Sequence, residues 1–124
     1  MPVIPAPSGP THQHGATRFT SLATPSRGTI DTSVWTVDLE PGANATPHTL
    51  TREEVFVVLE GSATVRIDGE PGVASAGDAI VLPAGARFEL TNPSEAPARL
   101  LCVLPVGGKA RLDDGTTFAP PWSE

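Results

Sequence analysis

Hydrophobic and polar residues alternate along short stretches of this chain. The segment TSVWTVDL (residues 32–39) places Trp35, Val37 and Leu39 on one face of an extended strand. The segment EEVFVVLE (residues 53–60) is apolar on both faces, which is typical of a strand packed on two sides. The pattern predicts further strands in RFTSLAT, ATVRID, GDAIVLP, RFELTN and ARLLCVLPV.

Turn-forming residues separate these runs. The separators are PGAN, EGS, DGEPG, PAGA and NPSEAP. No window of helical length carries an apolar stripe at helical spacing that is free of Gly and Pro. We therefore predict an all-β fold in which seven or eight short strands form an antiparallel sandwich or small barrel.

The two ends of the chain differ from this central pattern. Residues 1–16 are rich in Pro and Gly, and we expect them to form an extended arm. Residues 107–124 form a C-terminal extension, which we expect to pack back onto the barrel because Phe118 and Trp122 would otherwise be exposed to water.

Composition and charge exclude several classes of function. The chain has 124 residues, of which 39% are hydrophobic and 18% charged, as in a soluble single-domain protein. Its net charge is −6 and it has no Lys/Arg cluster, so we expect neither nucleic acid nor an anionic membrane as a partner. The longest apolar run, LLCVLPV, is too short to span a bilayer.

The cysteine count and the N-terminus favour a cytoplasmic protein. Cys102 is the only cysteine and cannot form an intramolecular disulfide, which agrees with a reducing compartment. The first residues lack the basic start and apolar core of a signal peptide. We expect Cys102 to be a small core residue.

Two spaced motifs carry the candidate chemistry. The first has the form G-x5-H-x-H-x3-E-x6-G, and the chain fits its spacing with Gly42, His48, Glu54 and Gly61. Leu50 stands where the motif has its second histidine. On this motif and the next, the chain resembles the cupins.

The second motif has the form G-x5-P-x-G-x2-H-x3-N. Gly77, Pro83, Gly85 and Asn92 fit its spacing, and Phe88 stands in place of the histidine. The glycines lie at turns that favour a positive φ angle, and Asn92 can bond the backbone of the following turn.

The resemblance implies a fold, a metal site and an assembly. The fold is a double-stranded β-helix, or jelly-roll barrel, which we assign to residues 17–106. In the family, three histidines and one glutamate hold Fe, Mn, Ni, Zn or a similar ion inside the barrel. The family also implies a homodimer, and the apolar strand at residues 53–60 agrees with it.

Only two of the four metal ligands are present, His48 and Glu54. A catalytic ion needs about three protein ligands and an open position. His12 and His14 on the arm could complete a set of three histidines and one glutamate around a divalent transition metal. Alternatively, these two histidines are solvated residues on a mobile arm and the barrel holds no cofactor.

Without a metal, His48 and Glu54 form a candidate catalytic pair. Burial would raise the pKa of Glu54 and lower that of His48, while pairing between the two would oppose both shifts. Such a pair could act as general acid and base, or could be a structural remnant. By strand parity, the apolar residues expected to line the ligand pocket are Leu50, Phe56, Val58, Phe88 and Leu90.

Leu50 and Phe88 remove metal ligands and also enlarge the apolar wall. We therefore expect a cupin that binds a small, largely apolar organic molecule and catalyses metal-independent isomerisation, cyclisation or dehydration. A metal-dependent oxygenase or isomerase that uses the arm histidines is the first alternative. A non-enzymatic module that binds or senses a small ligand is the second.

Overall fold

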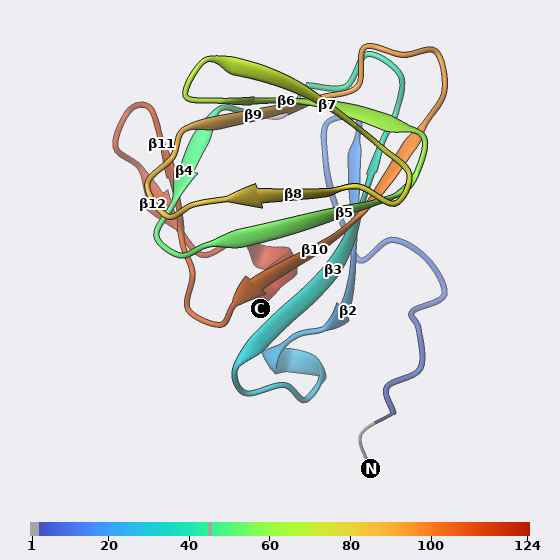
Figure 1. The fold of residues 1–124 in the computed structure, drawn as a ribbon. Helices are drawn as coiled ribbons and strands as arrows, with labels where there is room; N and C mark the ends of the chain where they lie inside the picture. Colours follow the sequence, from blue (N-terminus) through green and yellow to red (C-terminus); the bar gives the residue numbers. More distant parts are fainter. Residues whose placement is uncertain (1–2, 45) are drawn as a thin grey trace.

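The computed structural model describes residues 3–44 and 46–124, and within them twelve strands form two antiparallel six-stranded sheets (Figure 1). In spatial order, the first sheet contains β1 (His12–His14), β2 (Thr17–Ala23), β3 (Thr32–Leu39), β10 (Ala98–Pro105), β5 (Glu54–Glu60) and β8 (Ala79–Leu82). The second contains β12 (Thr117–Phe118), β11 (Ala110–Leu112), β4 (His48–Leu50), β9 (Phe88–Thr91), β6 (Ser62–Ile67) and β7 (Glu70–Ser75). The predicted all-β jelly-roll fold is confirmed.

The described residues contain more strands than the seven or eight that the sequence predicted. Four of the strands, β1, β4, β11 and β12, are only two or three residues long, which is too short for an alternating pattern to be visible. The helices are two 3-10 turns, η1 (Pro25–Arg27) and η2 (Pro121–Ser123). No helix in the described ranges is long and apolar enough to cross a membrane.

The central strands of the first sheet carry most of the core. In β3 the buried and less buried residues alternate, and β10 repeats the pattern. Leu100 pairs with Val37 and Cys102 with Trp35, and all four are buried between the sheets. Full burial of one large aliphatic side chain contributes about 1.5–3 kcal/mol, so this row stabilises the face on which the site is built.

Two of the motif positions have clear backbone roles. Gly61 has a φ of 73°, and a Cβ atom there would lie 2.5 Å from the carbonyl oxygen of Pro97, so no side chain fits. Asn92 is fully buried, and its side-chain amide donates to the carbonyl oxygens of Leu39 (3.0 Å) and Ala96 (2.8 Å). The motif therefore fixes turns, as the sequence predicted.

Both ends of the chain contact the barrel. Residues 1 and 2 of the expected arm lie outside the described residues, while His12–His14 forms strand β1 along the edge of β2. At the other end, the Trp122 ring stacks on Phe19 with centroids 3.6 Å apart. The Ser21 hydroxyl donates a 2.7 Å hydrogen bond to the carbonyl oxygen of Trp122. His14 and Trp122 from these two segments both line the cavity described next.

Candidate functional site

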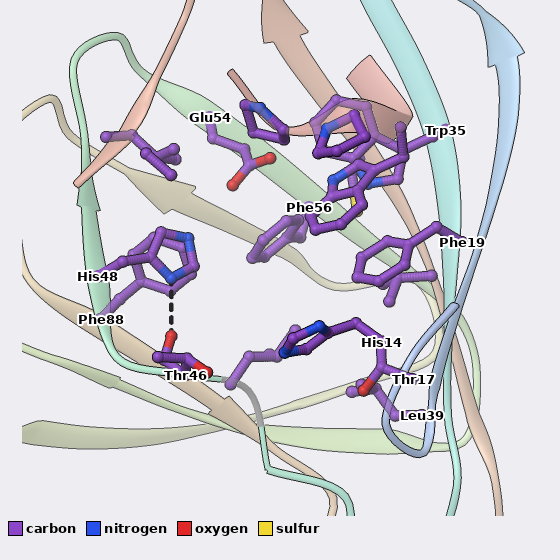
Figure 2. Close-up of a pocket in the computed structure, with 18 of the residues that line it drawn as sticks. His14, Thr17, Phe19, Trp35, Leu39, Thr46, His48, Glu54, Phe56 and Phe88 are labelled. Carbon is purple, nitrogen blue, oxygen red and sulfur yellow. Dashed lines mark hydrogen bonds between the residues drawn. The ribbon is translucent and has the colours of Figure 1, made fainter. Parts of the chain in front are cut away.

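A cavity of about 400 Å³ lies between the two sheets, and most of its wall is apolar (Figure 2). Its volume falls in the range of roughly 300–1,000 Å³ that is common for small-molecule sites. The lining residues are His14, Thr17, Phe19, Trp35, Val37, Leu39, Asn44, Thr46, His48, Leu50, Glu54, Phe56, Phe88, Leu90, Cys102, Ala110, Leu112, Phe118, Pro120, Pro121 and Trp122.

Glu54 is the acidic group of the cavity. Strand β5 directs it inward, and its side chain is 4% exposed. Its carboxyl group makes no hydrogen bond or ion pair with any residue that the structure describes, and Figure 2 shows it pointing into the cavity. Burial raises the pKa of Glu54 to about 8, so the group carries its proton at neutral pH.

His48 is the basic group. Its Nδ1 lies 2.7 Å from the carbonyl oxygen of Thr46. A carbonyl oxygen only accepts, so Nδ1 carries the proton and Nε2 keeps its lone pair. The His48 ring packs on Phe88 with centroids 4.3 Å apart. Burial lowers the pKa of His48 despite the opposing effect of the Thr46 hydrogen bond, so the imidazole is neutral at pH 7.

The sequence suggested that His48 and Glu54 would pair and oppose each other's pKa shifts. Within the described residues no hydrogen bond or ion pair joins them: His48 bonds Thr46 through Nδ1, and its Nε2 has no partner among those residues. The two predicted pKa directions are confirmed, and the expected pairing is wrong. A neutral acid and a neutral base therefore line the same cavity with their reactive atoms unpartnered.

The apolar residues singled out in the sequence do not all reach the cavity. Leu50, Phe56, Phe88 and Leu90 line it, and the Phe56 and Phe88 rings meet edge to face with centroids 6.0 Å apart. Val58 is fully buried but is not among the lining residues. Val58 lies two residues after Phe56 on β5, past the part of the strand that lines the cavity.

Residues distant in the sequence complete the wall, and the sequence analysis did not assign them to the site. Trp35 faces the cavity from β3, as its alternation could have indicated. Cys102 faces it from β10, and burial, with the nearby Glu54 charge, raises the pKa of its thiol well above the ordinary value. Phe19 and Trp122 stack on each other and both line the cavity, and the local sequence gives no signal for this contact.

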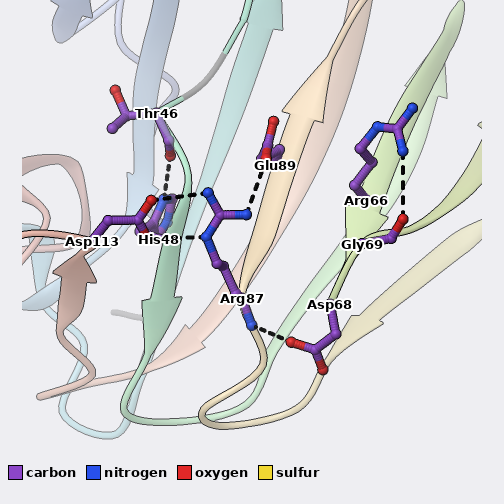
Figure 3. Close-up of polar contacts among 8 residues, drawn as sticks. All are labelled: Thr46, His48, Arg66, Asp68, Gly69, Arg87, Glu89 and Asp113. Carbon is purple, nitrogen blue, oxygen red and sulfur yellow. Dashed lines mark hydrogen bonds and ion pairs between the residues drawn. The ribbon is translucent and has the colours of Figure 1, made fainter.

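The second sheet carries a cluster of charged residues near β9 and β11. Arg87 bonds both carboxylate oxygens of Asp113, at 3.0 and 2.9 Å, and reaches Glu89 at 3.1 Å (Figure 3). These contacts tie the loop after β11 to β9 and hold the pKa of Asp113 below its usual range. The loop follows Leu112, which lines the cavity beside His48.

The donor set does not fit the metal site that the resembled motifs imply. Leu50 and Phe88 are buried hydrocarbon at two of the four ligand positions. His14 lines the cavity, whereas His12 does not. Among residues 3–44 and 46–124, no group of three or more His, Cys, Asp or Glu side chains is placed to hold an ion. Of the four positions, the described residues retain His48 and Glu54, and both line the cavity.

Comparison with known proteins identifies the relatives of this chain. Residues 35–104 match the family described as a cupin domain. The chain is 28% identical over 93 residues to the tetracenomycin polyketide synthase protein TcmJ of Streptomyces glaucescens, covering 74% of this chain and 62% of the relative. It is 42% identical over 48 residues to acetate kinase EutQ of Salmonella typhimurium, covering 39% of this chain and 21% of the relative. The chain thus spans less than two thirds of the length of these relatives.

Solved structures agree on the fold. The polyketide cyclase RemF from Streptomyces resistomycificus superposes with a TM-score of 0.74 at 22% identity, covering 80% of this chain and 72% of RemF. The ethanolamine utilization protein Q structure from Salmonella typhimurium gives 0.61 at 32% identity, covering 70% of this chain and 67% of that one.

We expect the stability of the protein to fall as pH rises from about 4.5 to about 8 because of Glu54. Across this window the unfolded carboxyl loses its proton and the folded one keeps it, so the folded state binds more protons and each pH unit costs about 1.4 kcal/mol. Urea unfolding of wild type and Glu54→Gln measures this effect. The free energy of unfolding of the variant minus that of wild type should increase with pH across this window. Below and above the window, this difference should be constant.

Because both proteins contain His48, its own titration cancels in that comparison. A difference between variant and wild type that is independent of pH would contradict the raised pKa.

We expect the double variant Leu50→His/Phe88→His to retain stoichiometric zinc through gel filtration, and the wild type to lose it. The variant supplies the two imidazoles that the donor set lacks. Elemental analysis of protein without a His tag measures this, with Leu50→Gln/Phe88→Gln as an equally polar control. Stoichiometric zinc in the wild type would show that the donor-set argument fails.

Proposed function

Because the chain belongs to the cupin family, we propose that its barrel binds a small aromatic ketone or phenol and catalyses acid–base chemistry on it. The reaction class is enolisation, which is the first step of isomerisation, cyclisation and dehydration of carbonyl compounds. Glu54 acts as general acid and His48 as general base.

The unpartnered Glu54 carboxyl carries this proposal. A buried polar group without a hydrogen bond costs free energy, and an apolar cavity wall offers no compensation. A ligand carbonyl or hydroxyl group beside Glu54 would supply the missing partner. The aromatic wall around it, with Trp35, Phe56 and Phe88, favours a planar, apolar ligand body.

The proton transfers balance in a single step. The protonated Glu54 donates a hydrogen bond, and then its proton, to the substrate carbonyl oxygen. His48 Nε2 takes the proton from the adjacent carbon, whose C–H electron pair becomes the enol double bond. The step leaves a carboxylate and an imidazolium in the same cavity. The imidazolium then delivers its proton to a different carbon of the conjugated enol, and the enol hydroxyl returns its proton to Glu54, which completes an isomerisation.

The likeness to TcmJ supports the substrate class. A polyketide synthase protein works among compounds rich in ketone and phenol groups, which are the groups that this acid and base could bind and enolise. Leu50 and Phe88 add buried hydrocarbon to the cavity wall, which supports chemistry on a largely apolar molecule. A non-enzymatic binding module would use the same cavity and differ only in lacking turnover.

We also propose that the protein is a homodimer. The outward face of β5 carries Val55 and Val57, which lie beside Val81 on the edge strand β8, and Val81 is 51% exposed. A contiguous apolar sheet face is a suitable surface for a second copy.

We expect the rate of enolisation to be bell-shaped in pH. The rate should fall below the lowered pKa of His48, where the base becomes protonated, and above about 8, where Glu54 loses its proton. Deuterium exchange at the α-carbons of 2-tetralone, followed by NMR in deuterated buffers, measures it. Glu54→Gln should abolish the alkaline limb and lower the rate on the order of a hundredfold, the usual effect of removing an acid or base.

His12→Gln is the matched control, since His12 does not line the cavity and its loss should leave the profile unchanged. Binding of 2-tetralone without exchange above the buffer rate would refute the catalytic proposal and favour the binding module.

We expect the wild type to sediment as a dimer at micromolar concentration and Val57→Lys to sediment as a monomer, because a charge at the centre of the apolar face disfavours burial. Val73→Lys is the control, as Val73 is 72% exposed on β7 of the other sheet. A wild-type monomer at that concentration would rule out the dimer.

A further inference from the structure

The cavity has two chemically different ends. Glu54 and Cys102 lie close together at a fully buried end. Figure 2 shows His14, Thr17 and Thr46 grouped away from Glu54, on the other side of the aromatic rings. His14 and Thr46 are exposed, so this second end opens to solvent. The cavity is thus a short channel with an acid at its closed end and other polar groups at its open end.

The hairpin of β1 and β2 positions two of these groups. His14 and Thr17 are paired residues on neighbouring strands, so their side chains lie on the same face of the hairpin. Gly15 between them has a φ of 60°, which makes the turn tight. The pairing holds an imidazole and a hydroxyl side by side at the open end.

Thr17 is the informative residue of the pair. Its side chain is 7% exposed, yet it lines the cavity and forms no side-chain hydrogen bond with the described residues. Its hydroxyl group therefore faces the cavity without a side-chain partner among the described residues. The His14 ring and the Thr46 hydroxyl, which also line the cavity, have no side-chain hydrogen bond to the described residues either. Donors and acceptors at this end are therefore available to a ligand.

We propose that this end binds a second oxygen substituent of the ligand, so that the preferred substrates are aromatic compounds with oxygen groups at both ends. This inference rests on the proposed function, because it takes the reacting carbonyl or phenol to lie beside Glu54. Thr17 and His14 are then specificity-determining residues: they contact the far end of the substrate and take no part in proton transfer.

Isothermal titration calorimetry with two naphthalene probes tests the proposal. The first, 2-naphthol, has one hydroxyl group, and the second, 2,6-dihydroxynaphthalene, adds another at the opposite end of the same ring system. We expect the second hydroxyl to tighten binding to wild type by about threefold to tenfold, the effect of one net hydrogen bond. Thr17→Val, which keeps the shape of the side chain, and His14→Ala should each weaken binding of the dihydroxy probe more than binding of 2-naphthol, and so remove most of that advantage.

Two controls separate this effect from general disturbance of the hairpin. His12→Ala removes the neighbouring histidine on β1, and Thr20→Val changes a threonine on β2, and neither residue lines the cavity. Both should keep the full preference for the dihydroxy probe. Equal affinity of wild type for the two probes, or equal loss in the controls, would overturn the inference but not the proposed function. Failure of both probes to bind would overturn both.

Discussion

The register of β5 is the constraint on which the site depends. Side chains of a strand alternate between its two faces, so Glu54 shares the inner face with Phe56 and Val58. Phe56 pairs with Ile80 on one side and with Cys102 on the other, and all three are buried. A shift of one residue would expose this row and bury Val55 and Val57 in its place. The ladder therefore fixes the acid in the dry interior.

The residues opposite the acid decide its chemistry. A cation in the cavity would stabilise the Glu54 carboxylate and lower its pKa. Leu50 and Phe88 supply hydrocarbon instead, and burial is the cause of the raised pKa. Phe88 also packs on His48, and burial favours the neutral form of the imidazole. Burial in this cavity thus favours an acid that is protonated and a base that is unprotonated at the same pH.

The sequence predicted the parts of this arrangement that follow from local rules. Turn positions such as Gly61 and Asn92, and the inward parity of Leu50, Phe56 and Phe88, follow from spacing and alternation, and the structure has those three side chains at the cavity. Their role toward a ligand stays a prediction.

Contacts between distant segments were not predictable in this way. His48 bonds the carbonyl oxygen of Thr46 through its Nδ1, and the alternation of polar and apolar residues carries no record of such a contact. The stacking of Trp122 on Phe19 joins two ends of the chain that carry no shared periodicity. Val58 was predicted to line the pocket and does not. Strand parity predicts which face a residue lies on, but not how far along the strand a cavity extends.

The cavity is built from two parts of the chain, and on the proposed function these parts have different roles. The acid, the base and the hydrocarbon that tunes them lie within residues 35–104, the segment shared with the cupin family. Other parts of the wall come from outside that segment, with His14, Thr17 and Phe19 before it and Leu112 and Trp122 after it. A barrel of this kind can keep its reactive groups in a fixed ladder while the terminal segments change the shape and polarity of the entrance. On the proposed function, the reaction class belongs to the barrel, and the choice of substrate belongs to the termini that fold over it.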